Sequence, residues 1–332
     1  DANRRGKRGG QVLMPSHLPD VAITDVTLRE YGQNVPSAYM GLFTPEVRTE
    51  IARNLMGAGF RNLEIFSLTP PKLSPAMDRQ ALRRIAGALG KHQGIQLITL
   101  VPNRAGYRDF HDLGLGPGGY GHTMGVFFSA VESHNLANLG RSIKKTLKDY
   151  RPVVEDAVSR GVPVAAYISA AFGYRKPHSR NLCKPTPETI SGYIDHWLDM
   201  GAGTVTLTDL QGVADSRETE HILEAVLDRR QGESLDLLGY HPHHVSGDQA
   251  VSNSLAAYRL GIRRFDSSLG GTGGCITGAP GNQPTEKLVA SFQGAGIDTG
   301  IDAQAVLSLS QNIRASLYKK IPLAKSEEEP SA

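Results

Sequence analysis

Cysteine is scarce in this sequence, with only Cys183 and Cys275 among 332 residues. Two thiols cannot form a disulfide framework, so the composition favours a reducing compartment, and we expect a cytoplasmic protein. The sequence also lacks an apolar run long enough to cross a bilayer, so we expect no association with membranes.

A strong excess of charge is missing as well. The chain has 36 Lys and Arg against 33 Asp and Glu, a formal net charge of +3. With no long basic stripe interleaved with aromatic residues, this balance argues against a dedicated nucleic-acid binder. By contrast, 39% of the residues are hydrophobic, enough for a large core in one big domain or two ordinary ones.

No Pro/Gly-rich linker or shift in composition divides the central part of the chain, so we predict one catalytic domain over 20–320. The basic, Gly-rich start at 1–19 and the charged end at 321–332 are predicted to be disordered tails. The first of these could alternatively be the remainder of a trimmed targeting segment.

Short β-rich runs alternate with amphipathic segments along the whole central part. Strands are predicted at 21–27, 62–66, 95–101, 123–128, 162–168, 204–208, 237–241 and 263–266. Helices are predicted after them at 45–57, 78–89, 104–113, 142–160, 187–200, 216–228, 249–260 and 284–294, with a last helix at 303–318. This alternation implies a parallel sheet with helical crossovers. The number of repeats fits a closed (β/α)8 TIM barrel with an extra C-terminal helix.

In a TIM barrel the chemistry is carried at the carboxyl ends of the strands. Several polar side chains lie in or after the predicted strands, at positions more than ~200 residues apart. The barrel would bring them to one rim: Arg29, Glu30, Glu64, Ser129, Asp209, His241, His243, Cys275 and Asn282.

His241 and His243 are spaced by two, which puts both rings on the same face of a strand. Together with the Glu30 carboxylate and the Asn282 amide oxygen they suit a divalent cation, Mg²⁺ or Mn²⁺, with Co²⁺ or Zn²⁺ as alternatives. Taken alone, histidines at strand ends are often only hydrogen-bonded rim residues. His244 is predicted to lie on the other face of the strand and not to be a ligand.

Arg29 and Glu30 are predicted to point to opposite sides of a strand end, so that Arg29 faces a carbonyl or carboxylate oxygen. An ordinary surface ion pair is the alternative. Glu64, on a strand that should be buried, needs a partner, either Arg29 or a metal-bound water. A purely structural ion pair is the alternative interpretation of Glu64. Cys275 follows the Gly-rich segment 270–274, which is typical of a lid carrying an acid or base. A small core residue is the other interpretation of Cys275.

Seven stretches carry a resemblance to a known family. They are DVTLREYGQN at 25–34, FRNLEIFSLTPPK at 60–72, LVPNRAGY at 100–107, FFSAVE at 127–132, LTDLQGV at 207–213, YHPHH at 240–244 and GGTGGCITGAPGNQPTEKLV at 270–289. Together they resemble the DRE-TIM metallolyase superfamily, and within it the 3-hydroxy-3-methylglutaryl-coenzyme A lyases. The resemblance extends over about 21–312, nearly the whole predicted barrel.

The resemblance implies a divalent-metal-dependent retro-Claisen cleavage of a 3-hydroxy acyl-CoA or a related hydroxy acid. It implies metal ligands at Glu30, His241, His243 and Asn282. It also implies an enolate-stabilising Arg29, a proton-transfer residue at Cys275, and acidic residues near the metal at Glu64 and Asp209. We further predict substrate contacts from Gln33, Ser129, His134 and Tyr167, and a homodimer.

The sequence departs from the lyase pattern at four places. Glu30 stands where the lyases have aspartate, His134 where condensing relatives carry histidine, and His244 where the family has aspartate. The segment from Cys275 to Asn282 is also slightly short. These departures keep open a Claisen-condensing acyltransferase that joins an acyl-CoA to a 2-oxo acid, like homocitrate and isopropylmalate synthases. An inactive barrel kept as a scaffold is a third hypothesis.

Overall fold

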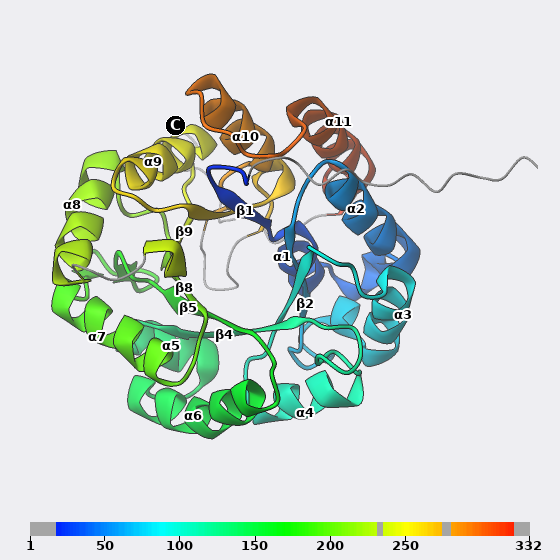
Figure 1. The fold of residues 1–332 in the computed structure, drawn as a ribbon, viewed down its shortest axis with the longest axis horizontal. Helices are drawn as coiled ribbons and strands as arrows, with labels where there is room; N and C mark the ends of the chain where they lie inside the picture. Colours follow the sequence, from blue (N-terminus) through cyan, green and yellow to red (C-terminus); the bar gives the residue numbers. More distant parts are fainter. Residues whose placement is uncertain (1–17, 231–234, 274–279, 322–332) are drawn as a thin grey trace, which may run out of the picture.

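Eight parallel strands close into a barrel at the centre of the computed structural model, which describes residues 18–230, 235–273 and 280–321 (Figure 1). Around the barrel the strands follow the order β1-β10-β9-β8-β5-β4-β3-β2. Their bounds are β1 (Ala22–Asp25), β2 (Asn62–Ser67), β3 (Gln96–Leu100), β4 (Thr123–Ser129), β5 (Val164–Ser169), β8 (Thr204–Asp209), β9 (Leu238–Pro242) and β10 (Arg264–Ser267). The predicted TIM barrel is confirmed.

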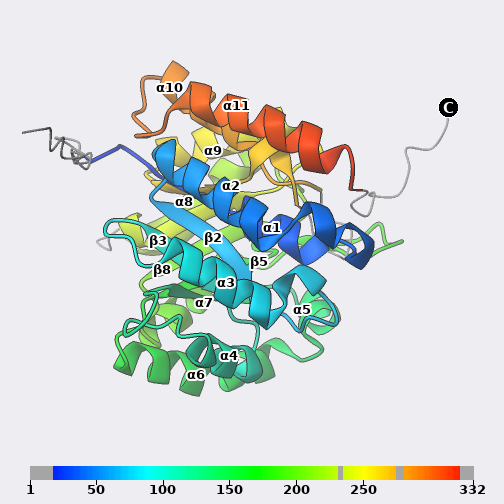
Figure 2. The ribbon, with the colours of Figure 1, turned by 90° about the vertical axis from the view of Figure 1, so that its right-hand side faces the viewer.

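A ring of helices covers the outside of the barrel, as the two perpendicular views show (Figures 1 and 2). These are α2 (Pro45–Gly57), α3 (Arg79–Leu89), α4 (Arg104–Asp112), α6 (Ile143–Ser159), α7 (Pro187–Asp199), α8 (Ser216–Leu227), α9 (Gly247–Arg259) and α10 (Thr285–Gly294). The extra C-terminal helix is α11 (Ala303–Ile313), which packs against α10. None of the helices in the described ranges combines the length and hydrophobicity needed to span a bilayer.

Short turns of helix complete the chain between these elements. They are η1 (Ser37–Leu42), η2 (Pro75–Met77), η3 (Asp228–Arg230), η4 (Leu235–Leu237), η5 (Leu269–Gly271) and the π-helical η6 (Arg314–Tyr318).

Side-chain alternation along the strands separates the core from the barrel mouth. Ala166 and Ile168 of β5 belong to the apolar core, whereas Tyr167 and Ser169, at the intervening positions, line a pocket. On β2 the neighbours of Glu64 are core residues, while Glu64 itself faces the pocket. Because successive strand residues point to opposite faces, the same short runs supply both the packing and the pocket lining.

Two helices and a hairpin were not predicted from the sequence: α1 (Thr27–Asn34), α5 (Glu132–Leu139), and the antiparallel hairpin of β6 (Tyr174–Arg175) and β7 (Leu182–Cys183). The first corrects a prediction, because the strand 21–27 ends at Asp25 and a helix begins at Thr27. Helix α1 is only eight residues long and largely polar, and no side chain caps its first turn. Its apolar stripe is short, with only Leu28 and Tyr31 at helical spacing, and no capping residue marks its start, so the sequence gives little indication of a helix here.

Candidate active site

Helix α1 brings the early charged residues to the mouth of the barrel. It packs against β2, and Figure 1 shows it inside the ring of outer helices, beside β1 and β2. The backbone amide of Leu269 donates to Thr27 Oγ1 at 2.8 Å, which ties the start of α1 to the segment after β10. Arg29, Glu30 and Gln33 therefore project from a helix over the pocket, not from a strand end.

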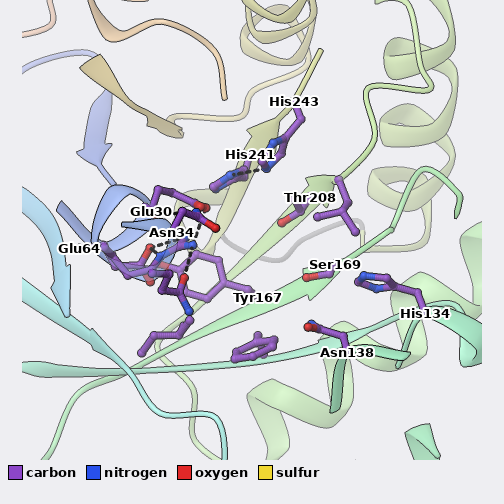
Figure 3. Close-up of a pocket in the computed structure, with 15 residues that line it drawn as sticks. Glu30, Asn34, Glu64, His134, Asn138, Tyr167, Ser169, Thr208, His241 and His243 are labelled. Carbon is purple, nitrogen blue, oxygen red and sulfur yellow. Dashed lines mark hydrogen bonds and ion pairs between the residues drawn. The ribbon is translucent and has the colours of Figure 1, made fainter. Parts of the chain in front are cut away.

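Glu30, His241 and His243 form a buried cluster whose potential ligand atoms all lie within 4.8 Å of one another. The two Nε2 atoms of the histidines are 3.0 Å apart, so the rings face the same point, as their spacing of two predicts. The Oδ1 atom of Asn282 lies 2.7 Å from His241 Nε2. Figure 3 shows the two imidazoles side by side above the Glu30 carboxylate.

The outer nitrogens of both rings are held by separate partners. His241 Nδ1 lies 2.9 Å from Asp266 Oδ2, and His243 Nδ1 lies 2.8 Å from the carbonyl oxygen of Pro280. Both partners are acceptors, so in the neutral ring each Nδ1 carries the hydrogen and each Nε2 presents a lone pair. Two nitrogen lone pairs and an amide oxygen therefore converge without a hydrogen between them, and a divalent cation fits this donor set.

Asn282 is oriented by the loop around it. Its Nδ2 donates to the carbonyl oxygen of Thr272 at 2.8 Å, which leaves Oδ1 turned toward His241. Gly273 has a φ of +112°, and a Cβ there would come within 2.4 Å of Asn282 Nδ2 and 2.9 Å of Glu30 Cβ. Glycine is thus required at this position, because its missing side chain lets the amide and carboxylate approach each other.

Electrostatics separate the protonation states of the cluster. Burial raises the pKa of the Glu30 carboxyl, but the Arg29 guanidinium and the two imidazoles outweigh it and hold that pKa below its ordinary value. Burial and the neighbouring His241 lower the pKa of His243 to about 3. Glu30 is therefore an anion and His243 a neutral ring at neutral pH. Burial lowers the pKa of His241, but Asp266 and Glu30 outweigh it and raise that pKa, so a cation binding there would displace a proton.

Arg29 lies between two carboxylates. Its Nε donates to Glu64 Oε2 at 2.8 Å, its second terminal nitrogen contacts the same oxygen, and its first terminal nitrogen pairs with Glu30. The predicted Arg29–Glu64 partnership is confirmed. The prediction that Arg29 and Glu30 point to opposite sides is wrong, because on α1 the two side chains form an ion pair.

The contacts that hold the Arg29 guanidinium in place leave one of its N–H donors unused. Gln33 Oε1 accepts from Arg29 at 3.2 Å, and Gln33 Nε2 donates to Ser67 Oγ at 3.1 Å. Of the five N–H groups of a guanidinium, four are used in these contacts, and the fifth has no partner in the described part of the chain. One donor of a fixed cation therefore remains for a ligand.

Of the predicted substrate-contacting residues, Gln33, His134 and Tyr167 line the pocket beside the cluster. Ser129 does not; its hydroxyl accepts from the amide of Val131 at 3.2 Å, at the turn that leads into α5. Its predicted contact with a substrate stays a prediction.

Asp209 also lies outside the pocket lining. Its two carboxylate oxygens accept from the backbone amides of Val213 and Ala214, each at 3.0 Å. Burial raises the pKa of this carboxyl to about 6, against the opposing effect of those amides. The contacts brace the loop whose Gly212, with a φ of +61°, packs on the backbone of His243. The structure thus places Asp209 behind the histidines; Cys275 lies outside the described residues.

Other side chains of the site were missed in the sequence. Asp266 anchors His241, while Thr208, Ser169 and Asn138 line the pocket. The period-2 pattern of their strands could have identified Thr208 and Ser169 as facing the barrel interior. Asn138 lies on α5, which was itself not predicted.

The chain resembles known proteins over nearly its whole length. The HMGL-like family model matches residues 20–313. The (R)-citramalyl-CoA lyase of Chloroflexus aurantiacus is 30% identical over 91% of this chain and 92% of its own. The hydroxymethylglutaryl-CoA lyase of Bacillus subtilis is 30% identical over 91% of this chain and 95% of its own.

Solved structures agree with these matches. The crystal structure of the Bacillus subtilis HMG-CoA lyase superposes with a TM-score of 0.78 at 28% identity, covering 94% of this chain and 97% of the other. The HMG-CoA lyase of Acinetobacter baumannii, solved with coenzyme A and 3-methylmalate, gives 0.77 at 26% identity, covering 94% and 98%.

A barrel with a cation-binding donor set and a buried guanidinium at its carboxyl mouth defines the class of metal-dependent carbon–carbon lyases. Within that class, the chain belongs to the HMGL-like family, and it is an enzyme with lyase activity.

Proposed function

We propose that this enzyme cleaves a 3-hydroxy acyl-CoA thioester by retro-Claisen chemistry, using Mg²⁺ or Mn²⁺ held by Glu30, His241, His243 and Asn282. The observation that carries the proposal is the convergence of these four donors beside the Arg29 guanidinium. The names of the relatives described above, which are lyases of acyl-CoA thioesters, support the choice of substrate class.

A divalent cation at this site would supply a Lewis acid that lowers the pKa of a substrate hydroxyl from its ordinary high value. The residues of the chain prepare the site for it. Asp266 and Pro280 keep the lone pairs of His241 and His243 pointed at one position. Glu30 contributes the negative charge that partly balances the cation.

The reaction balances without any co-reactant, because the proton that leaves the C3 hydroxyl is matched by the proton that the enolate carbon gains at the end. The C3 hydroxyl loses its proton, the C2–C3 bond breaks, and C3 becomes a ketone carbon. The bonding electrons pass to C2 and the thioester oxygen as an enolate. Arg29 is suited to stabilise that oxygen, because its guanidinium is fixed by Glu30, Glu64 and Gln33 before the charge develops.

Protonation of the enolate carbon then gives the acyl-CoA product. Cys275 remains our predicted proton-transfer residue for this step. Glu64 is a further group of the site: burial raises the pKa of its carboxyl, although Arg29 opposes the shift, and its Oε1 atom has no hydrogen-bond partner in the described ranges.

The test is a direct assay of the purified protein with added Mn²⁺. 3-Hydroxy-3-methylglutaryl-CoA should yield acetyl-CoA and acetoacetate, and citramalyl-CoA should yield acetyl-CoA and pyruvate. Cleavage of at least one thioester, abolished by a chelator and restored by Mn²⁺, would support the proposal. Release of free coenzyme A that requires both acetyl-CoA and a 2-oxo acid would instead select the condensing reaction.

Two further expectations from the sequence remain predictions. A homodimer is tested by light scattering of the purified chain, and a cytoplasmic location is tested by fractionation of cells that produce it.

A further inference from the structure

The pocket has a second polar region apart from the cation donors, formed by His134, Ser169 and Thr208, which we call the polar arm. Strand order explains its path along the rim. Thr208 of β8 pairs with His241 of β9, and β5, which carries Ser169, is the next strand. The amide of Ala130, after β4, donates to the Ser169 carbonyl at 2.8 Å, just before α5 begins. Figure 3 shows His134 and Ser169 together, away from Glu30 and Glu64.

His134 is the unusual member of the polar arm. Its side chain is fully buried, with 0% exposed, and it packs on the Tyr174 ring at a centroid distance of 4.7 Å. Neither ring nitrogen has a hydrogen-bond partner in the part of the chain that the structure describes. A buried polar atom left unpaired is destabilising, because it has lost its hydrogen bonds to water without replacing them. Two such atoms on one ring at a pocket wall indicate a partner that arrives with the ligand.

The chemistry of the arm restricts what that partner is. The charged side chains that line the pocket, Arg29, Glu30 and Glu64, all belong to the cation end. Burial lowers the pKa of His134 to about 4, so at neutral pH the ring is uncharged, with one donor and one acceptor nitrogen.

The two hydroxyls of the arm, on Ser169 and Thr208, likewise both donate and accept hydrogen bonds. A carboxylate only accepts, so it could pair only with the protonated nitrogen of His134, and a methyl group could pair with neither nitrogen, whereas a hydroxyl can pair with whichever nitrogen faces it. A hydroxyl group matches the arm because it donates and accepts in the same way.

We propose that the polar arm binds a hydroxyl on the C3 substituent of the substrate, and that His134 makes the enzyme favour such thioesters over those with a plain methyl group. The inference rests on the proposed function and narrows its substrate class. With the C3 hydroxyl at the cation end, and with two other bonds of C3 leading to the thioester and the carboxylate, the fourth substituent is the one that can extend along the arm.

The experiment compares two thioesters that differ by one oxygen atom: 3-hydroxy-3-methylglutaryl-CoA and 3-hydroxy-3-(hydroxymethyl)glutaryl-CoA. Both would release acetyl-CoA, which is measured with the Mn²⁺-loaded enzyme. The wild type should show a kcat/KM roughly 10–100 times higher for the hydroxymethyl compound, since its analogue leaves buried polar groups unpaired. Equal values for the two compounds would overturn the inference and leave the proposed function standing. Cleavage of neither would overturn the inference, and if citramalyl-CoA is not cleaved either, the proposed function fails as well.

Substitutions then assign the preference to His134. In His134→Phe the ratio of the two kcat/KM values should fall to about 1, because the hydroxymethyl compound loses more kcat/KM than the methyl compound. His134→Gln, which keeps a donor and an acceptor, should preserve part of the preference. His92→Phe is the matched control on an exposed loop and should behave as wild type. An unchanged preference in a folded His134→Phe variant would refute the assignment.

Discussion

Histidines stand at both ends of the pocket, and their surroundings differ. At the cation end, His241 and His243 each have Nδ1 fixed by an acceptor, so each Nε2 is aimed in advance. In the polar arm, neither nitrogen of His134 is engaged in the described chain. The anchored pair is prepared for one ligand geometry, whereas the unanchored ring takes its partner from whichever ligand arrives. We infer from this comparison that His241 and His243 serve to bind the cation, whereas His134 serves to discriminate between substrates.

The largest effect should come from removing an anchored ring. His243→Ala deletes one of the four converging donors, so Mn²⁺ binding measured by calorimetry should become undetectable. Turnover should fall at least ~10²-fold, because mutating even a residue that only hydrogen-bonds to a metal ligand lowers metal affinity or activity by roughly 10–100-fold. His244→Ala, one residue along the chain, is the control and should keep both properties. Retained Mn²⁺ affinity in His243→Ala would show that the cation binds elsewhere.

The next effect concerns the guanidinium shared by the two carboxylates at the cation end. Arg29→Lys keeps the positive charge but loses the fork that contacts both Glu30 and Glu64. We expect kcat to fall by about 10²–10³-fold, the usual loss for one donor to a developing oxyanion. Mn²⁺ affinity should change little. A parallel loss of Mn²⁺ affinity would instead assign Arg29 to holding Glu30 in place.

The buried, unpaired ring of His134 should also affect how the free energy of unfolding depends on pH. The pKa of His134 is lowered from 6.5 to about 4, so between those pH values the unfolded chain binds more protons than the folded one. The stability that depends on the neutral ring is present above pH 6.5 and is lost as the pH falls toward 4, about 3 kcal/mol in all.

Urea unfolding at neutral pH and near pH 4 measures this difference. His134→Phe should lose about 3 kcal/mol less than wild type between the two conditions, because phenylalanine does not titrate. At neutral pH the variant should be no less stable than wild type, since it buries no unpaired nitrogen. Equal losses in the two proteins would mean that His134 gains a partner on folding.

The smallest expected effect tests the anchoring itself. Asp266→Asn removes the charge that holds His241 Nδ1, and Mn²⁺ affinity should weaken by roughly 10–100-fold. Asp248→Asn, which alters an exposed ion pair with Lys287, is the control. An unchanged Mn²⁺ affinity in Asp266→Asn would indicate that the ring is held by packing alone.

Features that depend on residues close together in the sequence were predicted, and features that depend on distant residues were not. The strands and outer helices were predicted because their periodicity is local, and the spacing of His241 and His243 placed both rings together for the same reason. Helix α1 was not predicted, because it is held in place by contacts to β2 and to the backbone amide of Leu269, which lies far away in the chain. The error about Arg29 and Glu30 followed from it, since neighbouring side chains point to opposite faces on a strand but are only about 100° apart on a helix.

Residues that support the site from a distance were the hardest to predict. The contact between Asp266 and His241 joins two adjacent strands at positions 25 residues apart, and no local pattern marks it. Asp209 was predicted from the family resemblance as an acidic group near the metal, but only the fold shows that its carboxylate is used on backbone amides. The lack of any partner for His134 is likewise a property of the packed structure alone.

The closure of the barrel gives the cation site a role in folding. β1 and β10 pair at the seam where the two ends of the sheet meet, and Thr285 Oγ1 donates to Asp25 Oδ2 across it at 3.1 Å. Glu30 follows the first strand of the barrel, and Asn282 follows the last. A bound ion would therefore cross-link the two ends of the sheet at this junction. A partly folded chain, in which the last strand has not yet paired with the first, would have an incomplete set of metal ligands. The metal would therefore bind tightly only after the last strand has docked.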